Sequence, residues 1–209
     1  MREGRIGELV AAVARQALAD RGLGRVALLD DGSPGAALAA RFLERLGPGA
    51  LVRVRTEGPE VESILHALGR HPSDGPAARD AARLWARLEP DALSAAPDSK
   101  TTLLLGGELP PEPFFPLGDL WATEVAELAG GWSAPEEVRA LAEEAGGIEA
   151  LDAALRARVD RRDPAGLDAL PAPVAEEVRR RLERGRASRF SVRVVPKLGR
   201  RTVGVDLFE

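Results

Sequence analysis

The chain has 209 residues and a formal net charge of −4, and 44% of its residues are hydrophobic. Such a chain is long enough to bury one core, or one core with a helical appendage. It contains no cysteine, which excludes disulfides, thiolate metal sites and cysteine nucleophiles. His66 and His71 are the only histidines, so a histidine-based metal centre is not expected.

No segment approaches the roughly 18 to 20 apolar residues needed to span a bilayer, and the N-terminus lacks the apolar core of a signal peptide. The sequence therefore predicts a cytoplasmic protein that does not contact membranes. We expect one domain over residues 1–209, with a basic C-terminal tail over residues 179–209.

The tail is the main charge asymmetry of the chain, because residues 179–201 contain ten Lys/Arg against one acid, Glu183. This segment could be a solvated helix face followed by a basic tail. It could instead bind the phosphates of a nucleotide or nucleic acid, or an acidic partner. Aromatic residues make up only 4% of the chain, and scarce stacking platforms argue against nucleic acid.

The first half of the chain reads as alternating helices and strands. Apolar spacing predicts an amphipathic helix over residues 6–19, and the run at 26–29 predicts a strand. An Ala/Leu-rich helix at 36–46 and a short strand at 51–54 follow. Two strands joined by a helix indicate a parallel sheet, so we expect an α/β fold with a doubly wound, mostly parallel sheet flanked by helices.

The middle of the chain is less regular. Residues 61–68 and 77–88 look helical and are separated by a loop at 71–76, which places His66 on a helix and His71 in a loop. A third strand is expected at Thr101–Leu105, because its C-terminal side is fully apolar, as in a strand covered on both faces. Gly106 and Gly107 would end it.

The rest of the chain predicts a helical C-terminal part. Leu109 to Pro116 should be an irregular crossing, after which Asp119 is expected to cap a helix through Leu128. A capping box at Ser133 and Glu136 predicts the next helix. Further predicted elements are helices through Leu155 and over 173–186, and an extended segment from Phe190 to Val195.

The segment Asp30–Ala36 carries most of the functional signal. It lies between a strand and a helix, where unpaired N–H groups at the helix start commonly bind phosphate. Here Asp30 and Asp31 place two carboxylates in this position, and Pro34 removes one N–H donor. The segment therefore predicts a nucleotide-binding scaffold that has lost its chemistry.

Two further segments resemble a known family. Pro116–Val125, Pro-Leu-Gly-Asp-Leu-Trp-Ala-Thr-Glu-Val, is similar to the Pro-Leu-Gly-Asp-Leu-Tyr-Lys-Thr-Gln-Val segment of NAD synthetases. Ser99–Gly106 resembles their Asn-Lys-Ser-Glu-Leu-Leu-Leu-Gly. Weaker similarities at 135–138, 147–152 and 195–198 follow in the same order. The resemblance covers most of the chain and is weakest from 57 to 98.

The resemblance implies an adenine-nucleotide-hydrolase-like fold. It also implies an enzyme that adenylylates the carboxylate of nicotinic acid adenine dinucleotide with ATP and displaces AMP with ammonia. The family's pyrophosphate loop, Ser-Gly-Gly-x-Asp-Ser, falls on Asp30–Gly35, where both serines and the metal-binding aspartate are missing. Its Mg²⁺-holding glutamate falls on Thr102 and a lysine on Ala122. Residues 108–113 stand where the family has a stretch that contacts the dinucleotide. A helix runs through the region between Val138 and Gly147, where the family has a loop with an acidic continuation. Ala187-Ser188-Arg189 stands where the family has His-Lys-Arg.

The region between the second and third expected strands is also too short for the family's usual strand and helix. These departures predict a degenerate site with no catalytic residue. Carried over by position, the vestigial nucleotide-binding residues are Asp30, Asp31, Gly32, Ser33, Gly35, Lys100, Thr101 and Arg189. No metal site is expected, although in an alternative reading Asp30 and Asp31 hold Mg²⁺ and Lys100 and Arg189 meet phosphates.

Three functions follow as hypotheses. The first is a non-catalytic homologue that acts by protein association or nucleotide sensing, without a cofactor. The second is an active ATP-dependent amide ligase that converts deamido-NAD to NAD with ATP and Mg²⁺. The third is a nucleic-acid-binding protein that uses the basic tail. The family's long helices pair two subunits, so the resemblance also implies a homodimer, with a protein partner or an adenine nucleotide as further candidates.

Overall fold

A parallel sheet forms the centre of the N-terminal half in this computed structural model, which describes residues 2–71, 73–106, 113–188 and 195–197. Its strands are β1 (Arg25–Asp30), β2 (Leu51–Arg55) and β3 (Ala92–Ala95), in the spatial order β2-β1-β3. Both pairings are parallel, with Asp30 opposite Arg55 and Arg25 opposite Ala92. The structure confirms the α/β fold class and the first two predicted strands.

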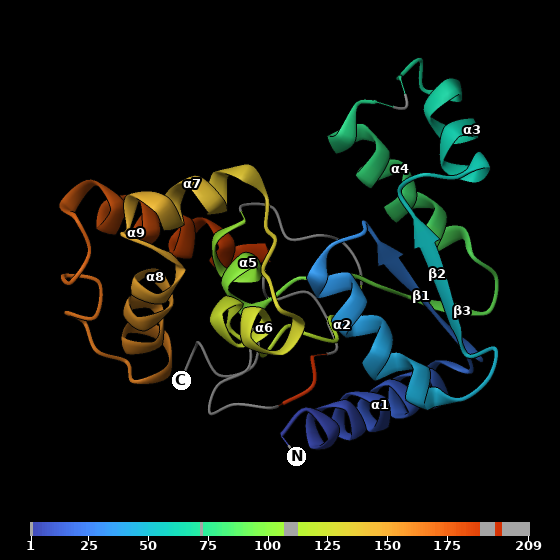
Figure 1. The fold of residues 1–209 in the computed structure, drawn as a ribbon, viewed down its shortest axis with the longest axis horizontal. Helices are drawn as coiled ribbons and strands as arrows, with labels where there is room; N and C mark the ends of the chain where they lie inside the picture. The colour runs from blue at the N-terminus through green and yellow to red at the C-terminus, as the bar shows by residue number, and fades with distance from the viewer. Residues whose placement is uncertain (1, 72, 107–112, 189–194, 198–209) are drawn as a thin grey trace.

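Helices cover both faces of the sheet, as Figure 1 shows. Strand β1 is buried along almost its whole length because its side chains alternate between two apolar clusters. Val26 and Leu28 pack with α1 (Arg2–Arg21) and α2 (Pro34–Leu43). Ala27 and Leu29 pack on the other face with α3 (Pro59–Ala67) and α4 (Gly75–Leu88).

The order of the strands sets where a ligand can approach. The chain passes from β1 through α2 to β2 on one side, and then through α3 and α4 to β3 on the other side of β1. Neighbouring connections therefore diverge at the carboxyl ends of β1 and β3. In open α/β sheets the crevice at such a reversal is where ligands bind.

The C-terminal half is helical and lies beside the sheet in Figure 1. Its elements are α5 (Lys100–Leu105), α6 (Ala122–Ala129), α7 (Glu136–Glu144), α8 (Ile148–Leu155), a π-helical turn η2 (Arg156–Asp160) and α9 (Ala172–Ser188). A short 3₁₀ turn, η1 (Glu44–Leu46), ends the α2 segment. These C-terminal helices enclose their own core around Phe115, Trp121 and Leu151.

One predicted strand is wrong. Residues 101–105 belong to helix α5, whose first turn is capped by the Ser99 hydroxyl accepting from the Thr102 N–H at 3.3 Å. The third strand is β3, an alanine-rich run nearer the N-terminus. The region after β2 therefore holds two helices and a strand, so the expectation that it was too short for a strand and a helix was also wrong.

Two predicted helix caps do not form. Asp119 does not cap α6; the helix begins at Ala122, and the Trp121 N–H donates to the Glu124 carboxylate at 3.0 Å. Helix α7 begins after Pro135 without a side-chain cap, so Ser133 and Glu136 do not form a capping box. Both helices are nevertheless present where the sequence predicts them, because each buries an apolar face: α6 packs Val125 in the cluster with α1 and α2, and α7 packs Val138 and Leu141 in the C-terminal core.

The predicted helix near 173–186 is confirmed as α9, and His66 and His71 lie on α3 and in the following loop as expected. The predicted segment at 190–195 and the stretch at 108–113 lie almost wholly outside the described residues. Within the part of the chain that the structure describes, no helix combines the length and apolarity needed to cross a membrane.

Candidate functional site

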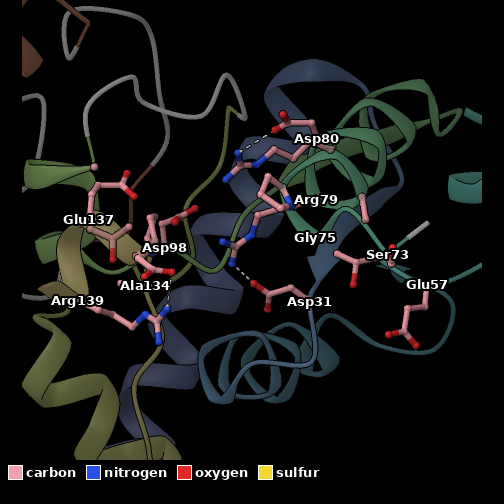
Figure 2. Close-up of a pocket in the computed structure, with 18 residues that line it drawn as sticks. Asp31, Glu57, Ser73, Gly75, Arg79, Asp80, Asp98, Ala134, Glu137 and Arg139 are labelled. Carbon is pink, nitrogen blue, oxygen red and sulfur yellow. Dashed lines mark hydrogen bonds and ion pairs between the residues drawn. The ribbon is translucent and has the colours of Figure 1, made fainter. Parts of the chain in front are cut away.

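A cleft of about 770 Å³ opens beyond the carboxyl ends of β1 and β3, at the crevice that the strand order creates (Figure 2). The loop after β1 contributes Asp31, and α4 contributes Arg79 and Arg83. Asp98 and Thr102 lie on the segment after β3, and the opposite wall comes from the start of α7. The sequence predicted a site at the β1 loop, but it did not predict the walls from α4 and α7.

In the loop after β1, backbone N–H groups donate hydrogen bonds to the loop's own carboxylates. The Gly32 N–H donates to Asp30 Oδ1 at 3.3 Å, and the Ser33 N–H donates to Asp31 Oδ1 at 3.1 Å. The Ser33 hydroxyl in turn accepts from the Ala36 N–H at 3.1 Å and caps α2. Backbone N–H groups that such a loop offers to a phosphate are thus bonded to side chains of the loop itself.

Two arginines hold these carboxylates in place. Arg53 on β2 donates from Nε and Nη2 to Asp30 Oδ2, at 2.9 and 2.8 Å. Arg79 on α4 pairs with the Asp31 carboxylate. Burial raises the pKa of Asp31, but the hydrogen bonds from Ser33 and the charge of Arg79 outweigh it, so the pKa lies below its ordinary value.

The loop's backbone geometry depends on its glycines and its proline. Gly32 has φ +74°, a left-handed conformation that favours glycine. A Cβ at Gly35 would lie 3.3 Å from the Pro97 carbonyl oxygen, so the start of α2 packs closely against the chain after β3. Pro34 occupies the first turn of α2, where it supplies no N–H.

The donor set of the loop does not fit Mg²⁺. Carboxylates are good Mg²⁺ ligands, but the oxygens of Asp30 and Asp31 are already bonded to guanidinium and backbone N–H groups. Thr102, at the position of the resembling family's glutamate, offers a hydroxyl that pairs with Ser99 Oγ at 3.1 Å. The described residues contain no group of three or more acidic or histidine side chains placed to hold a metal.

Asp98 lines the cleft with a carboxylate that is not fully hydrogen-bonded. Its Oδ2 atom is buried and accepts no hydrogen bond from the described residues. Burial raises the pKa of the Asp98 carboxyl, and the nearby charge of Asp31 raises it further, while Arg83 and Arg79 oppose the shift. No local pattern in the sequence predicts a role for Asp98, because its burial depends on elements that are distant in the chain.

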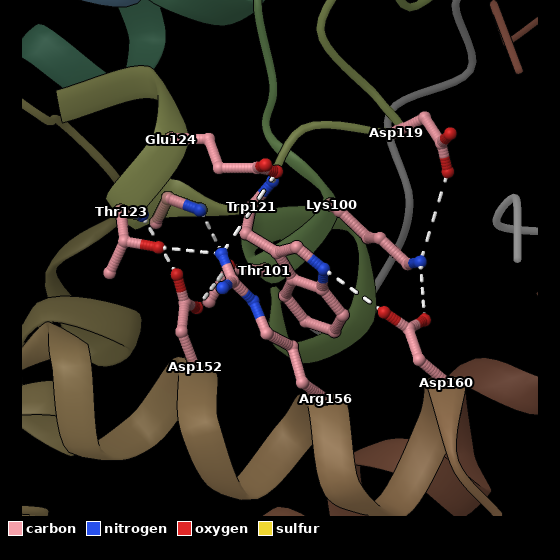
Figure 3. A network of polar contacts seen from close by, with 10 residues as sticks. Lys100, Thr101, Asp119, Trp121, Thr123, Glu124, Asp152, Arg156 and Asp160 are labelled. Atoms are coloured by element: carbon pink, nitrogen blue, oxygen red, sulfur yellow. Dashed lines mark hydrogen bonds and ion pairs between the residues drawn. The ribbon is translucent and has the colours of Figure 1, made fainter. Parts of the chain in front are cut away.

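Lys100 and Thr101 do not line this cleft. Lys100 is 1% exposed and donates from Nζ to Asp160 Oδ1 at 2.8 Å, with Asp119 Oδ1 at 3.8 Å (Figure 3). The Lys100 ammonium also lies 4.6 Å from the centre of the Trp121 ring, whose Nε1 donates to Asp160 at 3.3 Å. The lysine is therefore part of a buried network between α5, α6 and η2.

Thr101 belongs to the adjoining part of that network. Its hydroxyl donates to Asp152 Oδ1 at 2.6 Å and accepts from the Ala122 N–H at 3.0 Å. Asp152 Oδ2 accepts from the Thr123 N–H at 2.8 Å, and Arg156 donates to the Thr123 hydroxyl at 2.9 Å. Asp152, Arg156 and Asp160 recur every four residues, so one face of α8 and η2 locks α5 and α6 together.

The basic end of the chain is partly neutralised by its own acids. Arg179 pairs with Asp168 at 3.0 Å, and Arg180 and Arg181 both bond Glu177, at 2.6 and 2.7 Å. Arg181 also donates to the Leu105 carbonyl at 2.9 Å. Arg189 lies outside the described residues. Among the predicted site residues that the structure describes, only Asp31 lines the cleft, and the others at positions 30–35 belong to the loop beside it.

Comparison with known proteins identifies the fold. No protein-family model and no curated protein matches the chain. Among solved structures, the chain is similar to the NH3-dependent NAD synthetase from Campylobacter jejuni, determined in complex with nitrate. The match has a TM-score of 0.63 and 18% sequence identity, and it covers 90% of this chain and 96% of that one. The chain therefore has an NAD-synthetase-like fold along most of its length.

Proposed function

We propose that this chain is a non-catalytic relative of the NAD synthetases that binds a small ligand in the cleft without converting it. The observation that carries the proposal is the occupied loop: Asp30 and Asp31 accept the loop N–H groups and are held by Arg53 and Arg79. The cleft itself remains open, at about 770 Å³, a size typical of small-molecule sites.

A triphosphate would meet unfavourable charges at this loop. Two like unit charges 4 Å apart repel by about 1 kcal/mol in bulk water and about 4 kcal/mol near a protein surface, and the pairing of each aspartate with an arginine reduces this repulsion. To reach the loop N–H groups, phosphate oxygens would also have to displace both carboxylates from their guanidinium partners. Loss of a single electrostatic contact to a developing charge commonly costs about 10² to 10³ in rate, and here several are absent together.

The two other hypotheses have less support. An active ligase using Asp30 and Asp31 as Mg²⁺ ligands would need the metal to replace Arg53 and Arg79, which already neutralise these carboxylates. Nucleic-acid binding by the basic tail has less support, because the first arginines of the tail, Arg179, Arg180 and Arg181, are paired with acids of the same chain. Binding without turnover agrees better with both observations.

The decisive experiment supplies ATP, Mg²⁺, ammonia and deamido-NAD to the purified chain and measures NAD by an enzymatic cycling assay. A catalytically competent NH3-dependent NAD synthetase serves as the positive control. We expect no NAD above a protein-free blank. Robust turnover, with AMP released in step with NAD, would contradict the proposal and would mean that the loop rearranges to bind pyrophosphate.

A further inference from the structure

The charges that line the cleft do not balance. The described lining residues include three arginines, each with an acidic partner in the same lining: Arg79 with Asp31, Arg83 with Asp80 at 3.6 Å, and Arg139 with Glu136 at 3.4 Å. Three other acids line the cleft in addition to these partners: Glu57, Asp98 and Glu137. The cleft therefore has an acidic surplus.

Asp98 differs from the other two surplus acids in its surroundings. Glu57 and Glu137 are exposed, whereas the Asp98 Oδ2 atom is buried and accepts no hydrogen bond from any residue that the structure describes. In Figure 2, Asp98 lies between the α7 side chains and the Asp31–Arg79 pair. A buried carboxylate oxygen without a donor is costly for the protein, and a bound ligand that supplies a donor removes this cost.

From this arrangement we infer that the cleft binds a small organic cation, a guanidinium or primary ammonium group, with Asp98 as its carboxylate partner. This inference rests on the proposed function, which treats the cleft as a ligand site without catalysis. The loop after β1 favours the same sign of ligand, because the Gly32 and Ser33 N–H groups already donate to carboxylates and are not free for an anion. A cation would complete the hydrogen bonding of Asp98 Oδ2 and offset the surplus charge.

A pair of isosteric probes can test the sign of the ligand directly. We would titrate the full chain with n-butylguanidinium and with its neutral isostere n-butylurea, and follow amide shifts by NMR. We expect saturable binding of n-butylguanidinium with a Kd of about 1 mM, as is usual for a fragment of this size. The urea should bind at least about 10-fold more weakly, because it lacks the charge.

Variants then assign the binding to Asp98. Asp98→Asn keeps the side-chain shape and should weaken n-butylguanidinium binding by about 30-fold or more, as expected when one member of a buried charge pair is removed. Glu137→Gln removes the same charge from the exposed rim and should change the affinity by less than about 3-fold. Equal losses in the two variants would overturn the role of Asp98 and indicate general electrostatic attraction.

A proton-linkage measurement on the native chain remains decisive if Asp98→Asn fails to fold. The charged groups that act on Asp98 are Asp31 on the loop and Arg79 and Arg83 on α4, and the α7 wall of the same cleft carries Arg139, Glu136 and Glu137. Burial holds the pKa of Asp98 above its ordinary value, so a bound cation should expel its proton. Affinity should rise with pH until Asp98 is ionised, and calorimetry in two buffers should detect the released proton.

Absence of saturable n-butylguanidinium binding up to about 20 mM, or equal binding of the urea, would overturn the inference. Its failure is distinguishable from failure of the proposed function. A chain that forms no NAD and binds no cation refutes only the cation site, whereas a chain that forms NAD refutes the proposed function whatever its affinity for the probe.

Discussion

The ammonium of Lys100 lies 2.8 Å from Asp160 Oδ1, and both groups contact the same Trp121 ring system. Lys100 is 1% exposed, and Asp119 completes the ion pair with a fully buried side chain. The family resemblance placed this lysine at a nucleotide site, but its neighbours in the structure are those of a structural lysine that joins α5 to η2.

Removal of this lysine should destabilise the helical half. We expect Lys100→Ala to lower the free energy of unfolding by about 3 to 5 kcal/mol, because the buried Asp119 and the partly buried Asp160 would both lose this cation. Urea unfolding monitored by Trp fluorescence measures the change. The double variant Lys100→Met/Asp160→Asn removes both members of the 2.8 Å pair and leaves Asp119, so it should recover part of the loss. A loss below about 1 kcal/mol in Lys100→Ala would show that the pair contributes little.

The occupied loop can be reopened by substitution. The quadruple variant Asp30→Ser, Asp31→Gly, Pro34→Asp, Gly35→Ser removes both carboxylates from the loop, restores one N–H and adds a metal-ligating aspartate. We expect ATP binding weaker than about 1 mM in the native chain, and a gain of about 2 to 4 kcal/mol in the variant, or roughly 30- to 1,000-fold in affinity.

Calorimetry with Mg²⁺–ATP provides the measurement, and Asp80→Asn is the matched control because it removes one acid from the cleft wall and leaves the loop unchanged. Micromolar binding by the native chain, lost in Asp30→Ala or Asp31→Ala, would instead identify these carboxylates as metal ligands.

Asp31 and Asp98 should respond oppositely to pH. The pKa of Asp31 is below its ordinary 3.8 in the folded chain, so its contribution to stability is present above pH 3.8 and is lost as the pH falls through the lower value. The pKa of Asp98 is raised above 3.8, so ionisation costs stability as the pH rises through the raised value.

Urea unfolding of the native chain, Asp31→Asn and Asp98→Asn across this range tests both signs. The stability advantage of the native chain over Asp31→Asn should shrink in acid. Its stability relative to Asp98→Asn should be greatest in acid and should fall toward neutral pH. Parallel curves for the native chain and either variant would mean that the carboxyl concerned does not have the shifted pKa.

Self-association remains a prediction. The described surface carries exposed apolar side chains at Leu9, Leu68, Leu84 and Leu88, and two of these lie one turn apart on α4. We expect a homodimer at micromolar concentration, which light scattering would report as twice the 22.2 kDa monomer. A mass near that of the monomer throughout the micromolar range would contradict the dimer. If the chain is a dimer, Leu84→Glu and Leu9→Glu test whether α4 or α1 contributes to the interface.

The parts of the fold that the sequence predicted are those with a local pattern. The continuous apolar run of β1 and the βαβ order can be seen in a short window. Helix α5 was mistaken for a strand because all six of its residues are buried, so it shows no polar stripe of a surface helix. Strand β3 was missed because alanine has a weak preference for strands and its burial comes from both neighbouring layers.

The same limit applies to the site. The position of the loop and its two carboxylates were predictable, because strand, turn and helix follow directly in the chain. The roles of Arg53 and Arg79 were not, since they lie 23 and 48 residues from the carboxylates that they bind. Lys100 was assigned from a motif, and only the tertiary packing places it against Asp160 and Trp121.

The closed loop also has a consequence for how the protein behaves in a cell. The anions in it are covalently part of the chain, so their local concentration is fixed by the tether and does not change when metabolite levels rise or fall. A soluble phosphate compound would have to outcompete groups that never diffuse away. The hydrogen bonding of the loop is thus determined by the amino-acid sequence. Variation in nucleotide supply between growth and starvation should leave it unaltered.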